Sequence, residues 1–94
     1  MTEARAEVAV THPTGLHARP AVTFTKLAKT FPATIRLRRA PDGAWVDAKS
    51  IVKVMALKLR TGTVLELEAE GEAAEVAVAA LKALIERDFD EAHG

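Results

Sequence analysis

The chain has 94 residues, 49% of them hydrophobic, with zero net charge and no cysteine, which suits one compact domain and excludes disulfides, thiol catalysis and cysteine-ligated metal sites. No apolar run approaches the length of a membrane span, and the first residues lack the charged and then apolar layout of a signal peptide. We therefore expect one domain over residues 1–94, with a polar tail after about residue 89, in the cytoplasm and without membrane insertion.

The first third of the chain predicts a strand followed by a helix. Residues 3–11 alternate apolar and polar side chains, which is typical of a strand with one solvated face. Residues 12–15 break this pattern as a loop does. Between about residues 18 and 31 the apolar side chains follow a helical stripe, with Pro20 in the first turn and Pro32 at the end. The stripe consists of Ala21, Phe24, Leu27, Ala28 and Phe31.

The middle of the chain predicts a hairpin and a short helix. Residues 34–38 alternate again, and a turn signal at 41–43 separates them from a short returning strand at 44–46. Ser50 is suited to cap a brief helix over residues 51–58, because its hydroxyl can accept a hydrogen bond from a free backbone N–H of the first turn.

The last third predicts a strand and a helix. Residues 64–70 alternate three apolar side chains with Glu66, Glu68 and Glu70 on the solvated face. After Gly71 a helix begins with an acidic first turn, which suits the positive end of the helix dipole. Its expected apolar face consists of Val76, Ala77, Ala80, Leu81, Leu84 and Ile85.

The element order β-α-β-β-α-β-α predicts the fold class. Each helix has one apolar stripe and each strand has one apolar face, so the helices and the sheet must cover each other. We expect an α+β open-faced β-sandwich, in which three helices lie on one face of a four-stranded antiparallel sheet. Fold alone does not specify a function.

The segment Gly15-Leu16-His17-Ala18-Arg19-Pro20-Ala21 places a histidine where a loop becomes a helix. The free N–H groups and the dipole at a helix N-terminus favour an anion. The same field disfavours an imidazolium, so a ring nitrogen of His17 stays unprotonated and nucleophilic. Arg19 can bring its guanidinium to phosphate oxygens, and Gly15 permits a close approach of the backbone. This pattern predicts a phosphoryl acceptor that passes the group on.

An alternative from the residues alone is that His17 is a helix-capping or surface histidine. We expect His12, in a loop, and His93, in the tail, to occupy ordinary surface positions. The sequence contains no Gly-rich phosphate loop, no serine–histidine–acid set and no acidic grouping typical of a magnesium site. We therefore predict no metal and no cofactor, and we expect partner proteins to catalyse both phosphoryl transfers.

Charge is divided unevenly along the chain. Residues 1–60 contain 11 Lys or Arg against 4 Asp or Glu, a net +7, whereas residues 61–94 contain 2 against 9, a net −7. Two interpretations stay open. Either the charges belong to different solvated faces, or the basic half attracts an acidic partner or a phosphorylated group. Nucleic acid is not an expected partner, because Tyr is absent and few aromatic residues are interleaved with the basic ones.

From about Ala6 to Ile85 the chain resembles HPr, the family of histidine-containing phosphocarriers of the bacterial phosphoenolpyruvate:sugar phosphotransferase system. The resemblance is carried by the segment 15–21 and by Lys49-Ser50-Ile51-Val52-Lys53-Val54-Met55. It implies that His17 is phosphorylated on Nδ1 by the phosphoenolpyruvate-dependent first enzyme and that Arg19 assists the phosphoryl group. The group would then pass to a sugar-specific acceptor protein, so the chain is expected to be a carrier and not an enzyme.

The resemblance also implies a docking surface around the histidine, although several of its apolar residues could equally belong to the core. It consists of Gly15, Leu16, Ala18, Ile51, Val52 and Met55. A monomer suits a carrier that presents one face to several partners.

Ser50 has a second possible role besides the helix cap. In many relatives the matching serine is phosphorylated by an ATP-dependent kinase, which slows transfer at the histidine and creates a form that binds a transcriptional regulator. Lys53 departs from that regulated branch, which often has a small residue at this position. The alternative functions are a regulatory protein of the same fold, acting through Ser50 without sugar transport, and an unrelated ligand- or RNA-binding module.

Overall fold

The computed structural model describes residues 3–12 and 18–90 and confirms the expected element order. The elements are β1 (Glu3–Ala9), α1 (Ala18–Lys29), β2 (Thr34–Arg39), β3 (Val46–Asp47), α2 (Ile51–Ala56), β4 (Val64–Glu70), α3 (Ala74–Glu86) and a final 3-10 turn, η1 (Asp88–Asp90). In the part of the chain that the structure describes, no helix has the length and apolar character that crossing a membrane requires.

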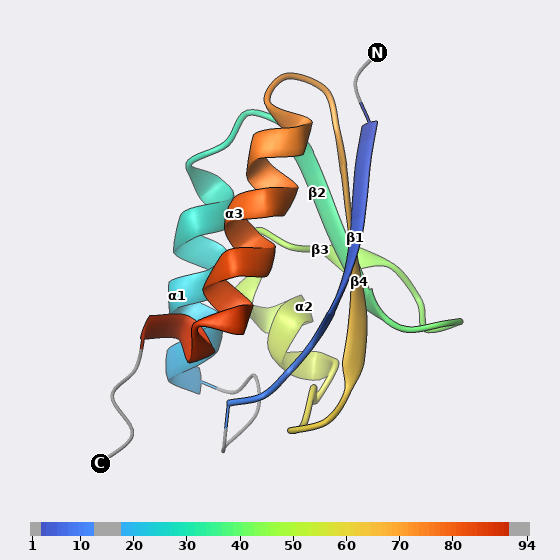
Figure 1. The fold of residues 1–94 in the computed structure, drawn as a ribbon, viewed down its shortest axis with the longest axis vertical. Helices are drawn as coiled ribbons and strands as arrows, with labels where there is room; N and C mark the ends of the chain where they lie inside the picture. The colour runs from blue at the N-terminus through green and yellow to red at the C-terminus, as the bar shows by residue number, and fades with distance from the viewer. Residues whose placement is uncertain (1–2, 13–17, 91–94) are drawn as a thin grey trace.

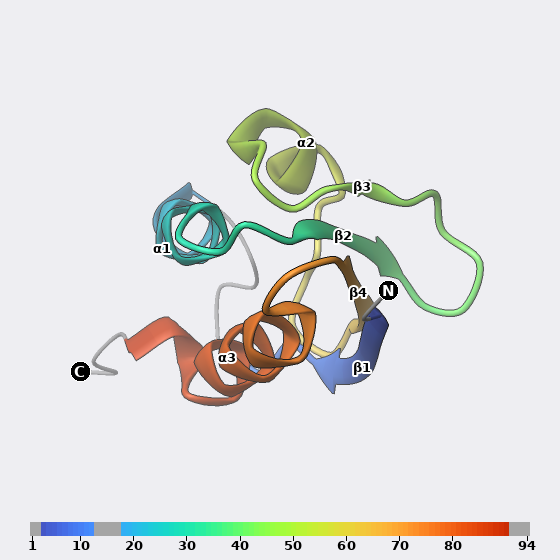
Figure 2. The same ribbon diagram turned by 90° about the horizontal axis from the view of Figure 1, so that it is seen from above.

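The four strands form one antiparallel sheet in the order β1-β4-β2-β3. β4 lies between β1 and β2, so that Leu67 is paired with Ala6 on one side and with Leu37 on the other. Figures 1 and 2 show the three helices on one face of this sheet, while the other face carries none. The expected open-faced sandwich is therefore confirmed.

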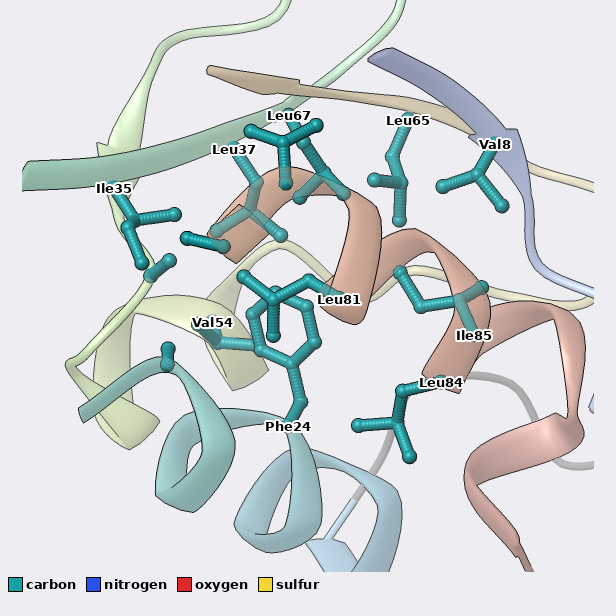
Figure 3. Close-up of a cluster of buried hydrophobic side chains, with 14 of the residues drawn as sticks. Val8, Phe24, Ile35, Leu37, Val54, Leu65, Leu67, Leu81, Leu84 and Ile85 are labelled. Carbon is teal, nitrogen blue, oxygen red and sulfur yellow. The ribbon is translucent and has the colours of Figure 1, made fainter. Parts of the chain in front are cut away.

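The hydrophobic core lies between the sheet and the helices (Figure 3). Every second residue of the strands points into the core from the sheet, and the apolar stripes of the helices cover it from the other side. Phe24 of α1 is fully buried and points into this layer. The larger buried side chains are Val8, Val10, Phe24, Ile35, Leu37, Val54, Leu59, Leu65, Leu67, Val78, Leu81, Leu84, Ile85 and Phe89.

Several details differ from the sequence-based expectation. Val76 is 62% exposed, so its placement on the apolar face of the last helix is wrong. The buried stripe of α3 instead begins at Ala74 and includes Val78. Successive residues of a helix are rotated by about 100°, which places Val76 on the opposite, solvated side. The short strand β3 occupies Val46–Asp47 and not residues 44–46, since the pairing with β2 involves Val46 and Asp47. The ring of Trp45 instead contacts the guanidinium groups of Arg5 and Arg38.

On the open face of the sheet, Glu68 is buried although it belongs to the solvated side of β4. Arg5 and Arg36, its cross-strand neighbours, approach the two carboxylate oxygens at 2.6 and 2.8 Å. Trp45 covers part of this face, with its ring centroid 4.5 Å from Cζ of Arg38. Burial acts to raise the pKa of Glu68, but the hydrogen bonds and charges of Arg5 and Arg36 outweigh it and leave the pKa below its ordinary value.

The lowered pKa of Glu68 predicts that this carboxylate contributes to acid sensitivity. Its stabilising contribution is fully present above the unfolded-state pKa, about 4.3, and is lost as the pH falls through the lower folded-state pKa. The wild type should lose unfolding free energy between neutral pH and about pH 3. We expect Glu68→Gln to lose less over the same range, because it has no carboxylate at this position to protonate. Urea unfolding, followed by the fluorescence of Trp45, measures this. Glu72→Gln, at an exposed glutamate, is the control, and equal acid sensitivity in the Glu68 variant and the wild type would contradict the prediction.

Candidate functional site

The first turn of α1 presents two residues to solvent and anchors two in the core. Ala18 begins the helix, as expected, and both Ala18 and Arg19 are exposed. Pro20 and Ala21 are buried and fix the helix against the rest of the domain. Gly15, Leu16 and His17 lie outside the described residues, so only the chain order relates them to this turn. By that order His17 directly precedes the helix.

The Arg19 side chain is available to a ligand at the start of α1. None of the ion pairs formed between described residues includes Arg19. Its backbone carbonyl accepts a hydrogen bond from the Thr23 hydroxyl at 3.3 Å, within the same helix. The guanidinium can therefore present its N–H groups to phosphate oxygens without first breaking an ion pair to a described carboxylate.

The helix α2 packs beside α1 (Figure 2). Val54 is fully buried and anchors α2, and the Lys49 ammonium donates a 2.8 Å hydrogen bond to the carbonyl of Phe31, just after α1. Val52 and Met55 are exposed by 75% and 41% on the outer side of the short helix. Two large apolar side chains on so short a helix form a surface suited to a partner.

The expected docking residues are thus divided between surface and core. Ala18, Val52 and Met55 are exposed. Ile51 is half-buried and packs against the core, so it also supports α2. Gly15 and Leu16 fall outside the described residues.

Ser50 caps α2, as the sequence predicted. It has an extended backbone conformation, with φ −103° and ψ 110°, and its hydroxyl accepts a hydrogen bond from the backbone N–H of Lys53 at 3.3 Å. The side chain is half-buried. The hydroxyl therefore satisfies one of the free N–H groups at the start of the helix.

The cap predicts a measurable stability effect. We expect Ser50→Ala to lower the unfolding free energy by about 1 kcal/mol, because it removes the side-chain acceptor of the Lys53 N–H. Ser50→Asp should retain most of that stability, since a carboxylate also caps a helix and interacts favourably with its dipole. Chemical denaturation of both variants measures the difference, and equal losses in the two would contradict the capping role.

His12 is not a surface residue, so the sequence-based expectation for it is wrong. It is buried, and its ring meets that of Phe89 edge-on, with centroids 5.8 Å apart. The Thr11 hydroxyl donates a 2.5 Å hydrogen bond to Oδ1 of Asp88, and the carbonyl of His12 accepts one from Thr61 at 2.6 Å. The C-terminal turn η1 thus holds the chain just before the segment that leads to His17. An apolar Phe89 in an otherwise polar C-terminal segment indicates that its own ring is buried, but it does not specify His12 as the partner.

The described residues contain no group of three or more His, Asp or Glu side chains positioned to hold a metal ion. Within these ranges, the features near the start of α1 are an exposed arginine, an open first turn and a neighbouring helix with exposed apolar residues. Together they can bind an anion and a partner surface, and they supply no general acid–base pair.

Comparison with known proteins finds similarity along almost the whole chain. A family model described as "PTS HPr component phosphorylation site" matches residues 4–87. The phosphocarrier protein HPr of Pseudomonas aeruginosa is 42% identical over 85 residues, which cover 90% of this chain and 93% of that protein.

Solved structures agree in fold. The crystal structure of HPr-C-His from Thermoanaerobacter tengcongensis has a TM-score of 0.87 and 40% identity, and covers 99% of this chain and 100% of the other. The solution structure of Crh, the Bacillus subtilis catabolite repression HPr, has a TM-score of 0.65 and 39% identity, over 87% and 95% of the two chains.

Proposed function

The chain belongs to the HPr family of phosphocarriers of the phosphotransferase system, and from this premise we propose that His17 is the residue that carries the phosphoryl group. A member of this family accepts the group on a histidine from the phosphoenolpyruvate-dependent first enzyme and is a carrier, not an enzyme. The observation that most strongly supports His17 is the start of α1 directly after it, with Ala18 and Arg19 facing solvent.

The proposed transfer is a displacement at phosphorus. A ring nitrogen of neutral His17, taken to be Nδ1 from the family resemblance, uses its lone pair to form the N–P bond. The bond between phosphorus and the donor enzyme breaks, and its electron pair stays with the donor. The onward transfer reverses these roles, with an acceptor protein as the nucleophile. Since the N-terminus of α1 favours an anion, the phosphoryl oxygens would be stabilised beside the ring.

We propose that Arg19 positions and neutralises the phosphoryl group on His17. Arg19→Lys keeps the positive charge but removes the planar fork that donates two parallel hydrogen bonds to phosphate. We expect transfer from the first enzyme to become about tenfold slower, equivalent to the loss of one charge-assisted hydrogen bond. Rapid-quench measurement of phosphoprotein formation tests this, with Lys26→Gln on α1 as the control. An unchanged rate would show that the planar fork of Arg19 is not used and that a positive charge at this position is sufficient.

The first enzyme and the sugar-specific acceptors of the family are the partners of the carrier. We propose that they dock on Gly15, Leu16, Ala18, Ile51, Val52 and Met55. The exposure of Val52 and Met55 beside α1 supports this surface. A cytoplasmic monomer, which is also part of the proposal, would present the surface to each partner in turn.

The decisive experiment for the carrier function locates the phosphoryl group. The purified protein is incubated with phosphoenolpyruvate, magnesium and the first enzyme, and peptides are analysed by mass spectrometry under alkaline conditions that preserve phosphohistidine. We expect one acid-labile phosphoryl group on the peptide that contains His17. Modification at another histidine would overturn the site assignment, and no modification with the host's own first enzyme would overturn the carrier function for this chain.

We also propose that Ser50 is a regulatory phosphorylation site, which its solvent-exposed hydrogen bond at the start of the helix that carries Val52 supports. A phosphoryl group there would add up to about two negative charges beside the exposed apolar residues of α2 and hinder docking. A serine kinase and a transcriptional regulator would then be further partners. Incubation with ATP and an HPr serine kinase tests this: a stable phosphate on Ser50 that slows His17 phosphorylation is expected, and its absence would leave Ser50 as a helix cap only.

A further inference from the structure

A basic hollow of about 440 Å³ lies between the end of β2 and the segment that connects α2 to β4. It is lined by Arg39, Lys58, Arg60 and Thr63, which supply three cations, one hydroxyl and no carboxylate. Figure 1 shows the α2–β4 segment at the lower end of the molecule, where α1 also begins. None of these four residues belongs to the proposed phosphoryl site or to the docking surface.

Backbone and side-chain hydrogen bonds hold the walls of the basic hollow in place. Arg39 donates through Nη2 to the carbonyls of Leu57 and Lys58, the latter at 3.3 Å, which joins the end of β2 to the end of α2. Thr63 accepts a 2.9 Å hydrogen bond from the N–H of Val10 and donates one of 3.0 Å to the carbonyl of Arg60. The cations are therefore carried on a backbone that is organised before a ligand arrives, which lowers the entropic cost of binding.

The positive charge in the hollow is not neutralised by the described part of the protein. The ion pairs between described residues include none of Arg39, Lys58 and Arg60. Lys58 has a left-handed backbone, with φ 51°, a conformation that costs energy for a lysine. Three like charges around one hollow repel each other, so an anion that enters it relieves the repulsion and gains charge-assisted hydrogen bonds.

We propose that the basic hollow binds a small polyanion with at least two phosphate groups. Three cations exceed what one phosphate requires, and the volume falls within the range of small-molecule sites. The Thr63 hydroxyl can add a neutral hydrogen bond to a bridging or ester oxygen. Lys58 follows the C-terminal residue of α2 closely, so the bound anion would lie at the end of the helix that carries Met55.

The test uses pyrophosphate as the probe and heteronuclear NMR of the whole protein as the readout. We expect the amide signals of Lys58, Arg60 and Thr63 to shift in a saturable way. The double variant Lys58→Asn/Arg60→Gln should bind about tenfold more weakly or worse, because it removes two charged contacts and retains Arg39, which holds the structure. Asparagine tolerates the left-handed conformation at position 58, so the variant keeps the local fold. Lys26→Gln/Lys29→Gln on α1 is the matched control and should bind as the wild type does.

Four outcomes would overturn the proposal. Pyrophosphate affinity could be unchanged in the Lys58/Arg60 variant, which would exclude these two residues. The affinity could be equally reduced in the control, which would mean diffuse attraction by the basic half of the chain. Inorganic phosphate could bind as tightly as pyrophosphate, which would exclude recognition of two phosphate groups. A single-stranded oligonucleotide could bind more tightly than pyrophosphate through the same residues, which would assign the hollow to a nucleic-acid backbone. None of these measurements uses the first enzyme, so each result stands apart from the carrier function.

Discussion

His17→Ala is expected to abolish phosphorylation of the chain by phosphoenolpyruvate and the first enzyme. Alanine has no lone pair that can form a bond to phosphorus, so the effect is loss of the reaction and not a change in rate. The remaining positive groups, including Arg19, could still bind an anion but could not accept the phosphoryl group. Intact mass measured at alkaline pH should show one added phosphoryl group in the wild type and none in the variant.

The other two histidines give this prediction its controls. His12 is 5% exposed and packs against Phe89, so its ring cannot approach a donor enzyme without local unfolding. His93 lies outside the described residues, and His93→Ala should be phosphorylated as the wild type is. A circular dichroism spectrum of His17→Ala that matches the wild type shows that the fold is intact. An acid-labile phosphoryl group that persists in His17→Ala would transfer the carrier role to another histidine.

Local sequence patterns predicted the elements that position the site. The spacing of Ala21, Phe24 and Ala28 and the proline at position 20 define the direction and the start of α1, because they act within one or two turns. Ser50 predicts its own cap for the same reason, since donor and acceptor are three residues apart. The strand β4 matches its predicted limits, because apolar and charged residues alternate from Leu65 to Glu70.

Contacts between distant segments were not predictable from these patterns. His12 is buried because Phe89, far along the chain, returns to cover it. Glu68 is buried by arginines from two other strands, whose register no local pattern specifies. The basic hollow joins Arg39 to Lys58 and Arg60 only after the end of β2 reaches the segment behind α2. In each case the sequence gives the residue type, and tertiary structure gives its neighbours.

Phe24→Ala is expected to have the largest effect on stability. Phe24 is fully buried between the sheet and the helices, and truncation removes its apolar contacts and leaves a cavity (Figure 3). Such substitutions cost about 3–5 kcal/mol, whereas the whole unfolding free energy of a domain is about 5–15 kcal/mol. Urea denaturation followed by Trp45 fluorescence should therefore show a midpoint near the lower limit of measurement, or an unfolded chain.

Two further variants keep this prediction testable if Phe24→Ala does not fold. Val22→Ala, on the same helix but 38% exposed, should cost far less, and Phe24→Leu should be intermediate because leucine fills part of the cavity. If Phe24→Leu and Val22→Ala were equally mild, Phe24 would not anchor α1.

Since α1 begins with Ala18 and Arg19, loss of this anchor would also release the first turn that holds Arg19 near His17. We expect the first turn of α1 to loosen in Phe24→Leu at a lower temperature than the sheet does. The rate of phosphoryl transfer to this variant should therefore begin to fall below the temperature at which the domain unfolds.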